Sequence, residues 1–224
     1  MFLLSNVSSP TSIISLMKSH LVQHNYYLES LQEIKKINGD KKPTLLLHDC
    51  CGPCACFPLL FLCKHFDVTI YYTNSNIYPE KEFDKRLGEV KKLVQYMKDT
   101  WGYEVKLVVS PYNHEEYMKD LRSLSSLPEG GYRCHLCYRK RMEETFSYAD
   151  AHHFDYITTV MTISRQKSSE IMNRIGEELS THYHTKYLFS DFKKNGGIDQ
   201  GVALRNQIGL YCQNYCGCEY SFPK

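Results

Sequence analysis

The stretch TLLLHDCCGPC, from Thr44 to Cys54, joins a short apolar run to a group of cysteines. Its first four residues predict a buried strand. Gly52 permits unusual backbone dihedrals and Pro53 fits the first turn of a helix, so we predict a loop and then a helix over Ala55–Phe66. Loops that follow the strands of a parallel sheet form its ligand-binding edge. The stretch therefore predicts cysteines at the carboxyl edge of an α/β sheet.

Strand and helix patterns alternate along the rest of the chain. The expected strands are Thr44–Leu47, Val68–Tyr72, Glu104–Val109 and Tyr156–Met161. The expected helices are Ala55–Phe66, Glu80–Trp101, His114–Leu124, Cys134–Ala151 and Ser168–Glu178. This alternation predicts an α/β fold with a parallel sheet and flanking helices. We expect an N-terminal helical extension over residues 1–42 and one α/β catalytic domain with a cysteine-rich metal site over residues 43–224.

Composition narrows the setting in which the protein works. The chain has 224 residues, of which 42% are hydrophobic, and a formal net charge of +2. This charge neither requires nor excludes a nucleic-acid partner. We see no apolar stretch of membrane-spanning length and no basic segment ahead of the N-terminal apolar patch, so we expect a soluble cytoplasmic protein that does not bind membranes. In a reducing cytosol, ten cysteines indicate metal binding or catalysis rather than structural disulfides.

Seven of the ten cysteines fall into three clusters, and the first is the Cys50–Cys51 doublet followed by Cys54. In a loop between a strand and a helix, both members of the doublet can turn toward one pocket. Cys54 would reach the same pocket from the start of the helix, where a thiol loses its proton more readily. We interpret all three as candidate metal ligands. Cys56 and Cys63 lie in an apolar run and are expected to be buried, inert thiols.

The second cluster is a C-x-x-C formed by Cys134 and Cys137 at the start of a predicted helix. This spacing alone is ambiguous among zinc, iron–sulfur and thiol redox sites. A [4Fe–4S] cluster needs four thiolates, and this pair together with Cys50 and Cys51 would supply them. Structural zinc remains the alternative.

The third cluster, Cys216 and Cys218, forms a C-x-C. Such a pair can chelate a metal or form a strained, easily reduced disulfide, and we favour a redox-active pair. Asp49, next to the doublet, is a candidate ligand, with Cys54, of a second, mononuclear metal, either iron or zinc. An Asp that caps the loop or the next helix is an equal alternative.

Six ordered segments resemble one known family. They are HDCCGPC, NSNIYPEKEFDKRL, GGYRCHLCYRKRMEET, ITTVMTISRQKSSEIMNRIG, SDFKKNGG and LYCQNYCGCEYS. Together, over about Leu45–Ser221, they resemble the cobalamin-independent epoxyqueuosine reductases. The family fold resembles the adenine-nucleotide α-hydrolase (HUP-like) type, but this chain lacks the S-G-G-x-D-S loop that grips pyrophosphate.

The resemblance implies a reaction and its parts. The reaction is the two-electron removal of the epoxide oxygen of epoxyqueuosine in tRNA, in the tRNAs for tyrosine, histidine, asparagine and aspartate, with an electron donor. It implies a [4Fe–4S] cluster on Cys50, Cys51, Cys134 and Cys137, an adjacent mononuclear metal, and a redox-active disulfide between Cys216 and Cys218. Cys212 stands where the family usually has arginine. If that arginine contacts a phosphate, this chain lacks one bidentate phosphate contact.

The residues around the second cysteine cluster are candidates for contacts with RNA. Because sequence-specific RNA contacts usually involve unpaired bases, we expect stacking and phosphate contacts from residues around the second cysteine cluster. The candidates are Tyr132, Arg133, Arg139 and Arg141. A metal-free thiol–disulfide oxidoreductase and a zinc-stapled RNA-binding module are the alternatives, although neither explains the Cys50–Cys51 doublet as simply.

Overall fold

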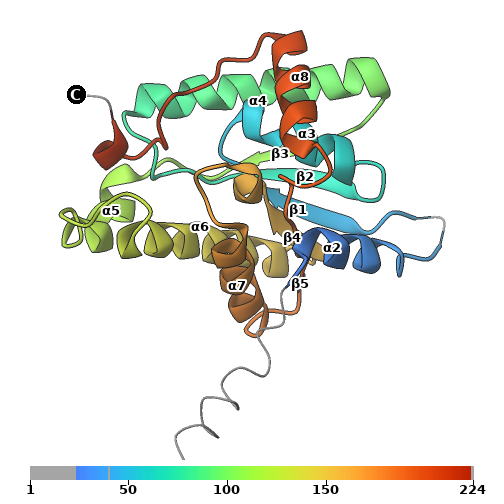
Figure 1. Cartoon of the computed structure of the whole chain (residues 1–224), viewed down its shortest axis with the longest axis horizontal. Coiled ribbons are helices and arrows are strands. Elements are labelled where there is room, and N and C mark those ends of the chain that lie inside the picture. Colours follow the sequence, from blue (N-terminus) through green and yellow to red (C-terminus); the bar gives the residue numbers. More distant parts are fainter. Residues whose placement is uncertain (1–23, 40, 223–224) are drawn as a thin grey trace, which may run out of the picture.

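A computed structural model describes residues 24–39 and 41–222 (Figure 1). Most of the predicted N-terminal extension, residues 1–23, lies outside these ranges. Within them, helix α2 (Tyr26–Ile34) begins at Asn25, whose side chain accepts a hydrogen bond from the Leu28 amide. The ring of Tyr26 stacks on Phe189, so this helix packs on the body of the protein. The boundary at residue 42 stays a prediction.

Five parallel strands form one sheet in the order β3-β2-β1-β4-β5. The strands are β1 (Thr44–His48), β2 (Asp67–Tyr72), β3 (Lys106–Val109), β4 (Tyr156–Thr159) and β5 (Lys186–Tyr187). The predicted α/β class with a parallel sheet is therefore confirmed. The chain runs outward from β1 through β2 to β3 and then returns to the other side of β1 as β4. The carboxyl ends of β1 and β4 thus flank the crevice where such folds bind ligands.

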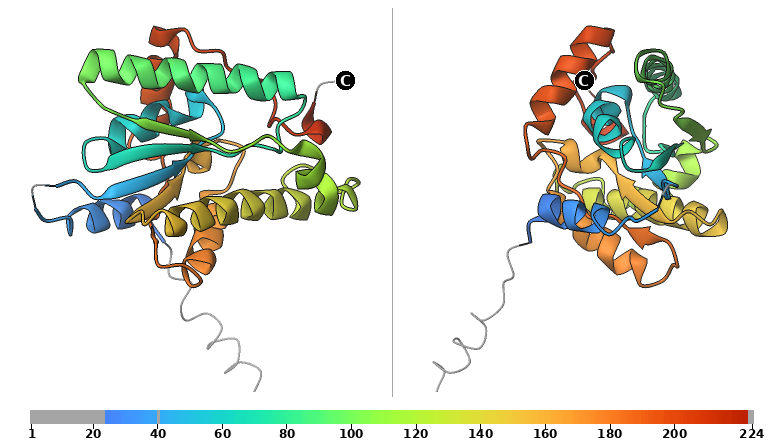
Figure 2. Two further views of the ribbon diagram at one scale, coloured as in Figure 1. Left: turned by 180° about the vertical axis from the view of Figure 1, so that it is seen from behind. Right: turned by 90° about the vertical axis from the view of Figure 1, so that its right-hand side faces the viewer.

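Helices cover both faces of the sheet (Figures 1 and 2). One face carries α3 (Gly52–Leu62), α4 (Glu80–Trp101) and α8 (Gly197–Ile208), and the other carries α6 (Tyr132–Ala151) and α7 (Ser169–Ser180). Helix α5 (His114–Arg122) packs against α6. Two hydrophobic clusters, one on each side of the sheet, hold these layers together.

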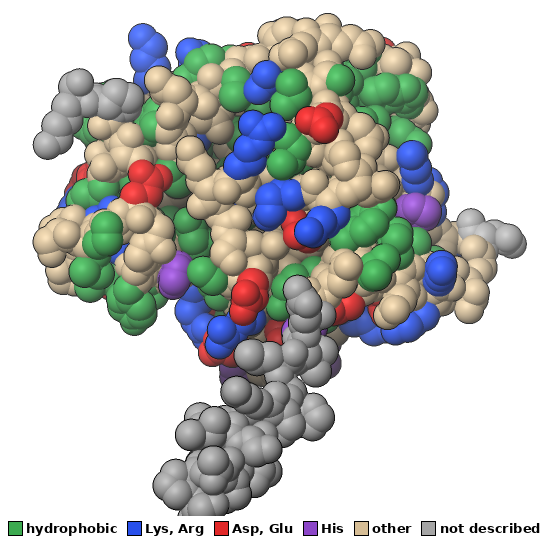
Figure 3. All heavy atoms as spheres, in the orientation of Figure 1, with side chains coloured by type: hydrophobic (Ala, Val, Ile, Leu, Met, Phe, Trp, Pro, Cys, Tyr) green, Lys and Arg blue, Asp and Glu red, His purple; other side chains and the backbone are tan. Residues whose placement is uncertain are grey.

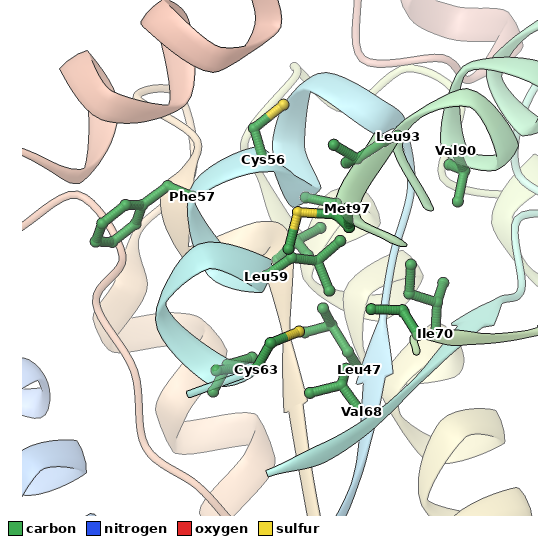
Figure 4. Packing of buried hydrophobic residues seen from close by; sticks show 14 of the residues in the cluster. Leu47, Cys56, Phe57, Leu59, Cys63, Val68, Ile70, Val90, Leu93 and Met97 are labelled. Atoms are coloured by element: carbon green, nitrogen blue, oxygen red, sulfur yellow. The ribbon is translucent and has the colours of Figure 1, made fainter. Parts of the chain in front are cut away.

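Helix α3 is apolar on all sides because it is packed between the sheet, α4 and α8. Its Cys56 and Cys63 are buried in the larger cluster, where Figure 4 shows them among Leu59, Met97 and neighbouring side chains. The α3–α4 packing is close, since a Cβ on Gly52 would lie 2.8 Å from the backbone oxygen of Glu89.

Three features differ from the expected elements. Helix α3 begins at Gly52 rather than at Ala55, so Cys54 lies within its first turn. The fourth strand ends at Thr159, where a short 3-10 helix (Val160–Ile163) takes over. Helix α8 and the two-residue β5 were not predicted, because α8 begins with glycine and has a weak apolar stripe.

The surface is mixed in character. On the face seen in Figure 3, Lys and Arg side chains are interspersed with Asp and Glu and with small hydrophobic patches. Among the described residues, we find no helix that combines the length and the apolar character needed to span a membrane.

Candidate metal and redox site

The first cysteine cluster lies directly after β1, at the carboxyl edge of the sheet. The Asp49 amide donates to the carbonyl of Tyr71 on β2, and one Asp49 carboxylate oxygen accepts from the Cys51 amide at 3.1 Å. Cys51 is extended and precedes helix α3, so the chain turns there from strand into helix. This turn gathers the sulfurs of Cys50, Cys51 and Cys54 within 4.8 Å of one another.

Of the three thiols in this group, Cys50 is the one whose thiolate form is favoured. Hydrogen bonds from the thiols of Cys51 and Cys54 hold the pKa of Cys50 well below its ordinary value. The same interactions with Cys50 raise the pKa of Cys51 and of Cys54. The Cys51 and Cys54 sulfurs are 2.7 Å apart. Three sulfurs this close, with thiolate already favoured on one, form a donor set that suits a thiophilic metal ion.

The other two cysteine clusters meet in a second pocket. A small cavity of about 20 Å³ is lined by Cys134 and Cys137 from the start of α6 and by Cys216 and Cys218 from the C-terminal segment. Asn76, from the loop after β2, also lines it. Burial raises the pKa of Cys137 to about 11. Two segments far apart in the sequence therefore bring four thiols to one place, and a third segment adds Asn76.

Arg141 lies between the two groups of thiols. It is buried, with its Nε 3.2 Å from His48 Nε2 and its Nη2 3.0 Å from Asn74 Oδ1. Burial opposes its charge, but the charges of Cys50 and Cys137 raise its pKa overall. Burial and the Arg141 charge lower the pKa of His48 to about 3, so this histidine is neutral. Arg141 therefore supplies a buried positive charge that stabilises the thiolate of Cys50, whereas burial keeps Cys137 protonated.

Lys167 supplies a second cation near the same sulfurs. It follows the short 3-10 helix after β4. Burial opposes its charge, but Cys216 and Cys50 raise its pKa overall. No ligand spacing in the sequence marks this lysine as a site residue.

Arg86 of α4 holds the C-x-C segment in position. Its Nε pairs with Glu82 at 2.7 Å and its Nη1 donates to the carbonyl of Cys216 at 3.1 Å. Gly217 has φ +123°, and a Cβ there would lie 2.9 Å from Arg86 Nη1. The amide of Tyr78 donates to the Gly217 carbonyl at 2.7 Å. The glycine of the C-x-C is thus required both by its backbone conformation and by the arginine packed against it.

Four buried side-chain atoms have no hydrogen-bond partner among the described residues. They are Asp49 Oδ2, Asn76 Oδ1, Arg86 Nη2 and Gln213 Oε1. All four residues border the cysteines. Since buried polar atoms are seldom left unpaired, this concentration indicates a bound group that completes the site. Burial raises the pKa of the Asp49 carboxyl group, and its oxygens are not part of the close group of sulfurs formed by Cys50, Cys51 and Cys54. The residues present therefore fit a metal centre.

The residues expected to contact RNA divide into two kinds. Arg133 and Arg141 are buried, and Arg133 donates to the carbonyls of Ser125 and Leu127 at 2.7 Å each. Tyr132 has 65% of its surface exposed, and Arg139 forms a partly exposed ion pair with Glu178. Of these four residues, only Tyr132 and Arg139 present a side chain that a large partner can reach.

Comparison with known sequences assigns the chain to a family. The sequence model of a family described as epoxyqueuosine reductase QueH matches residues 45–224. This chain belongs to that family. The QueH of Streptococcus pyogenes serotype M1 is 36% identical over 197 residues, which is 87% of this chain and 77% of that protein.

Two further epoxyqueuosine reductases of the QueH family extend the match. The Staphylococcus epidermidis protein is 32% identical over 214 residues, covering 95% of this chain and 90% of its own length. The Thermotoga maritima protein is 30% identical over 182 residues, covering 80% and 90% respectively. The resemblance noted from six sequence segments is therefore confirmed at the level of the family.

Several site residues of this QueH family member were not singled out from sequence. Arg86 and Gln213 reach the cysteines from α4 and from the C-terminal segment, and Asn74 binds both Arg141 and the backbone of Asp49. Each is a common polar residue without a metal-ligand spacing, so composition alone gave no signal. Cys212 is exposed, with its sulfur 3.3 Å from Arg205 Nη1.

Proposed function

We propose that this chain reduces epoxyqueuosine in tRNA to queuosine at an iron–sulfur centre. The observation that carries the proposal is the convergence of seven cysteines from three segments on one edge of the sheet, in a member of a family whose named relatives are epoxyqueuosine reductases. The proposed [4Fe–4S] ligands are Cys50, Cys51, Cys134 and Cys137. A cluster of four irons holds its cysteine sulfurs farther apart than one ion does, which suits two neighbouring groups of thiols.

The donor set also accommodates a mononuclear metal. Cys54 and the unpaired oxygen of Asp49 are the proposed ligands, and iron or zinc accepts such mixed sulfur and oxygen ligands. When bound, the metals supply one-electron transfer and a Lewis acid for the epoxide oxygen.

The C-x-C pair can supply the electrons and protons that the reaction consumes. Removing the epoxide oxygen to leave a C=C bond and water consumes two electrons and two protons. Oxidation of the Cys216 and Cys218 thiols to a disulfide releases the same number of each, with one S–S bond formed. An external reductant must then restore the dithiol. Arg86 holds the pair against the pocket that also contains Cys134 and Cys137.

The RNA substrate has an open approach to this pocket. A groove of about 710 Å³ shares Arg133 and Tyr220 with the cysteine pocket. Its other lining residues are Ser125, Leu127, Pro128, Glu129, Glu219 and Phe222. We propose that the modified base enters here, with Tyr132 and Arg139 as stacking and phosphate contacts. Arg133 supports the wall of the groove, since its guanidinium lies 4.2 Å from the centre of the Tyr220 ring.

The test is anaerobic reconstitution with iron and sulfide, followed by incubation with epoxyqueuosine-containing tRNA and a strong reductant. Mass spectrometry of the digested tRNA should show loss of one oxygen atom from the modified nucleoside. The Cys216→Ala variant should retain iron and sulfide while it loses multiple turnover. Unchanged epoxyqueuosine after incubation with fully loaded protein would refute the proposal.

One observation favours an alternative. The close group of Cys50, Cys51 and Cys54 also suits a single zinc ion. Protein that contains zinc without acid-labile sulfide, and that binds tRNA without changing it, would be a zinc-stapled RNA-binding module. Metal-free protein that reduces generic disulfides would instead be a thiol–disulfide oxidoreductase.

A further inference from the structure

Gln213 connects the C-terminal segment to the first cysteine group. Its side-chain Nε2 donates to the sulfur of Cys51 at 3.1 Å, across a sequence separation of 162 residues. Its other amide atom, Oε1, is buried and has no partner among the described residues. The side-chain amide therefore donates one hydrogen bond to a proposed metal ligand. Its oxygen accepts none from the described residues.

The backbone on both sides of Gln213 is fixed independently. The amide of Tyr211 donates to Glu89 Oε2 at 2.8 Å, and the hydroxyl of Tyr215 donates to the carbonyl of Tyr78 at 2.9 Å. These contacts hold the segment against α4 and the loop before it. Gln213 is thereby presented to Cys51 and is not needed to anchor the segment itself.

Two other proposed cluster ligands receive comparable hydrogen bonds. The amide of Gly130 donates to the Cys134 sulfur at 3.2 Å. The hydroxyl of Tyr117 lies 3.2 Å from the Cys137 sulfur and 2.9 Å from the Cys137 carbonyl oxygen, so these two acceptors share its proton. Three of the four proposed ligands thus accept an N–H or O–H from the chain. Such donors stabilise the more electron-rich state of an iron–sulfur cluster and raise its reduction potential.

We propose that Gln213 is a positioning residue that raises the reduction potential of the metal–thiolate centre through its N–H···S hydrogen bond to Cys51. The proposal rests on the proposed function, since it takes the centre to be an iron–sulfur cluster with Cys51 as a ligand. It also gives the segment that carries Cys216 and Cys218 a direct contact with a cluster ligand. The state of that segment and the potential of the cluster are then coupled.

The experiment is an equilibrium redox titration of the anaerobically reconstituted full chain, followed by absorption and electron paramagnetic resonance. Gln213→Leu removes the donor and the unpaired oxygen together. We expect its midpoint to move to a more negative potential, so that at the wild-type midpoint the ratio of reduced to oxidised cluster falls about tenfold, which is about 59 mV for one electron. Gln213→Glu, which adds a negative charge, should move further in the same direction.

Gln207→Leu is the matched control. Gln207 also donates from its side-chain amide, to the hydroxyl of Tyr96 at 2.7 Å, but on the exposed side of α8. Its replacement should leave the midpoint unchanged. Tyr117→Phe removes the donor to Cys137 and should lower the midpoint as Gln213→Leu does.

A stability measurement separates tuning from a structural role. Because Gln213→Leu removes a buried unpaired oxygen along with one weak hydrogen bond, its unfolding midpoint should equal or exceed that of wild type. A lower unfolding midpoint together with an unchanged redox midpoint would mean a structural residue and would overturn the proposal. The redox midpoint describes the loaded fraction only, so incomplete iron loading does not obscure it.

The outcomes distinguish this proposal from the proposed function. Wild-type protein without iron and sulfide would refute both. A wild-type cluster whose midpoint responds to Tyr117→Phe but not to Gln213→Leu would refute the role of Gln213 alone. A shift in Gln213→Leu and Gln213→Glu with Gln207→Leu unchanged would establish it.

Discussion

Two sets of cysteines only a few residues apart in the sequence have opposite chemistry. Cys50, Cys51 and Cys54 lie at the sheet edge where α3 begins, and hydrogen bonds from its two neighbours lower the pKa of Cys50. Cys56 and Cys63 lie farther along the same helix in the hydrophobic core, where burial raises the pKa of each to about 12. The residue type is the same, so the difference comes from position.

The comparison shows which surroundings favour a thiolate in this fold. At the edge, thiols face one another and the buried cation of Arg141, so a negative charge is stabilised. In the core, the surroundings are leucine, phenylalanine and methionine, which stabilise only the neutral form (Figure 4).

The largest expected effect separates the two sets directly. Cys51→Ala should abolish binding of iron, because a buried ligand at the centre of the group is lost. Cys56→Ala should keep the full metal content and cost about 1 kcal/mol of unfolding free energy, because it removes one buried atom. Metal and sulfide analysis with urea denaturation measures both. Full iron content in Cys51→Ala would break the comparison.

Substitution of Arg141 tests whether a buried positive charge distinguishes the edge thiols from the core thiols. Arg141→Met removes a buried cation that faces thiolates and polar groups, so we expect a loss of about 3 kcal/mol in unfolding free energy and a weaker metal affinity. Arg139→Met, two residues away on the same helix, breaks a partly exposed ion pair and should cost below about 1 kcal/mol. Equal losses in the two variants would show that the Arg141 charge does not matter to the site.

Alkylation sharpens the comparison within a single sample. In reduced, metal-free protein at pH 7, Cys50 should react with iodoacetamide ahead of the core thiols, because its lowered pKa favours the thiolate. Raising the pH from 7 to 9 should leave Cys56 and Cys63 unmodified, since a pKa of about 12 keeps them protonated. Peptide mapping gives the rate at each site. Modification of Cys56 before Cys50 would contradict the lowered pKa of Cys50 and the raised pKa of Cys56.

The smallest expected effect on stability comes from the C-x-C segment, which carries Cys216 and Cys218. Gly217→Ala places a Cβ against Arg86 at a positive φ, so we expect a loss of about 1 kcal/mol and a slower reduction of epoxyqueuosine. Gly88→Ala, on the exposed side of α4 with open space around it, should instead stabilise the protein by up to about 1 kcal/mol. Urea titrations of both variants make the comparison. Similar stabilities would remove the case for a glycine requirement in the C-x-C.

Much of the fold followed from local patterns. Helix α4 has the bounds that its apolar spacing predicted, and the α/β class followed from the alternation of elements. Helix α8 was missed because its position is set by close packing on α3, not by a stripe of its own. Local periodicity cannot report such tertiary contacts.

The candidate site was predictable only in part. The cysteine spacings marked the three clusters, but not that Cys134 and Cys137 share a pocket with Cys216 and Cys218. The partners that hold them are not marked by any spacing. Arg86 comes from α4, whereas Arg141 and Gln213 come from the segments that carry the second and third cysteine clusters. The sequence predicts Arg133 and Arg141 as RNA contacts, whereas in the structure both side chains are buried and bound within the chain.

The contact between Cys51 and Gln213 also has a consequence for how the protein must be handled. Two side chains separated by 162 residues meet only after the intervening sheet has formed, because long-range loop closure is slow. Until then, ten thiols are held on an incompletely folded chain. Refolding in air would allow wrong disulfides to form before the correct neighbours meet, so recovery of native protein should depend on a strong thiol reductant during folding and should decline when the reductant is added afterwards.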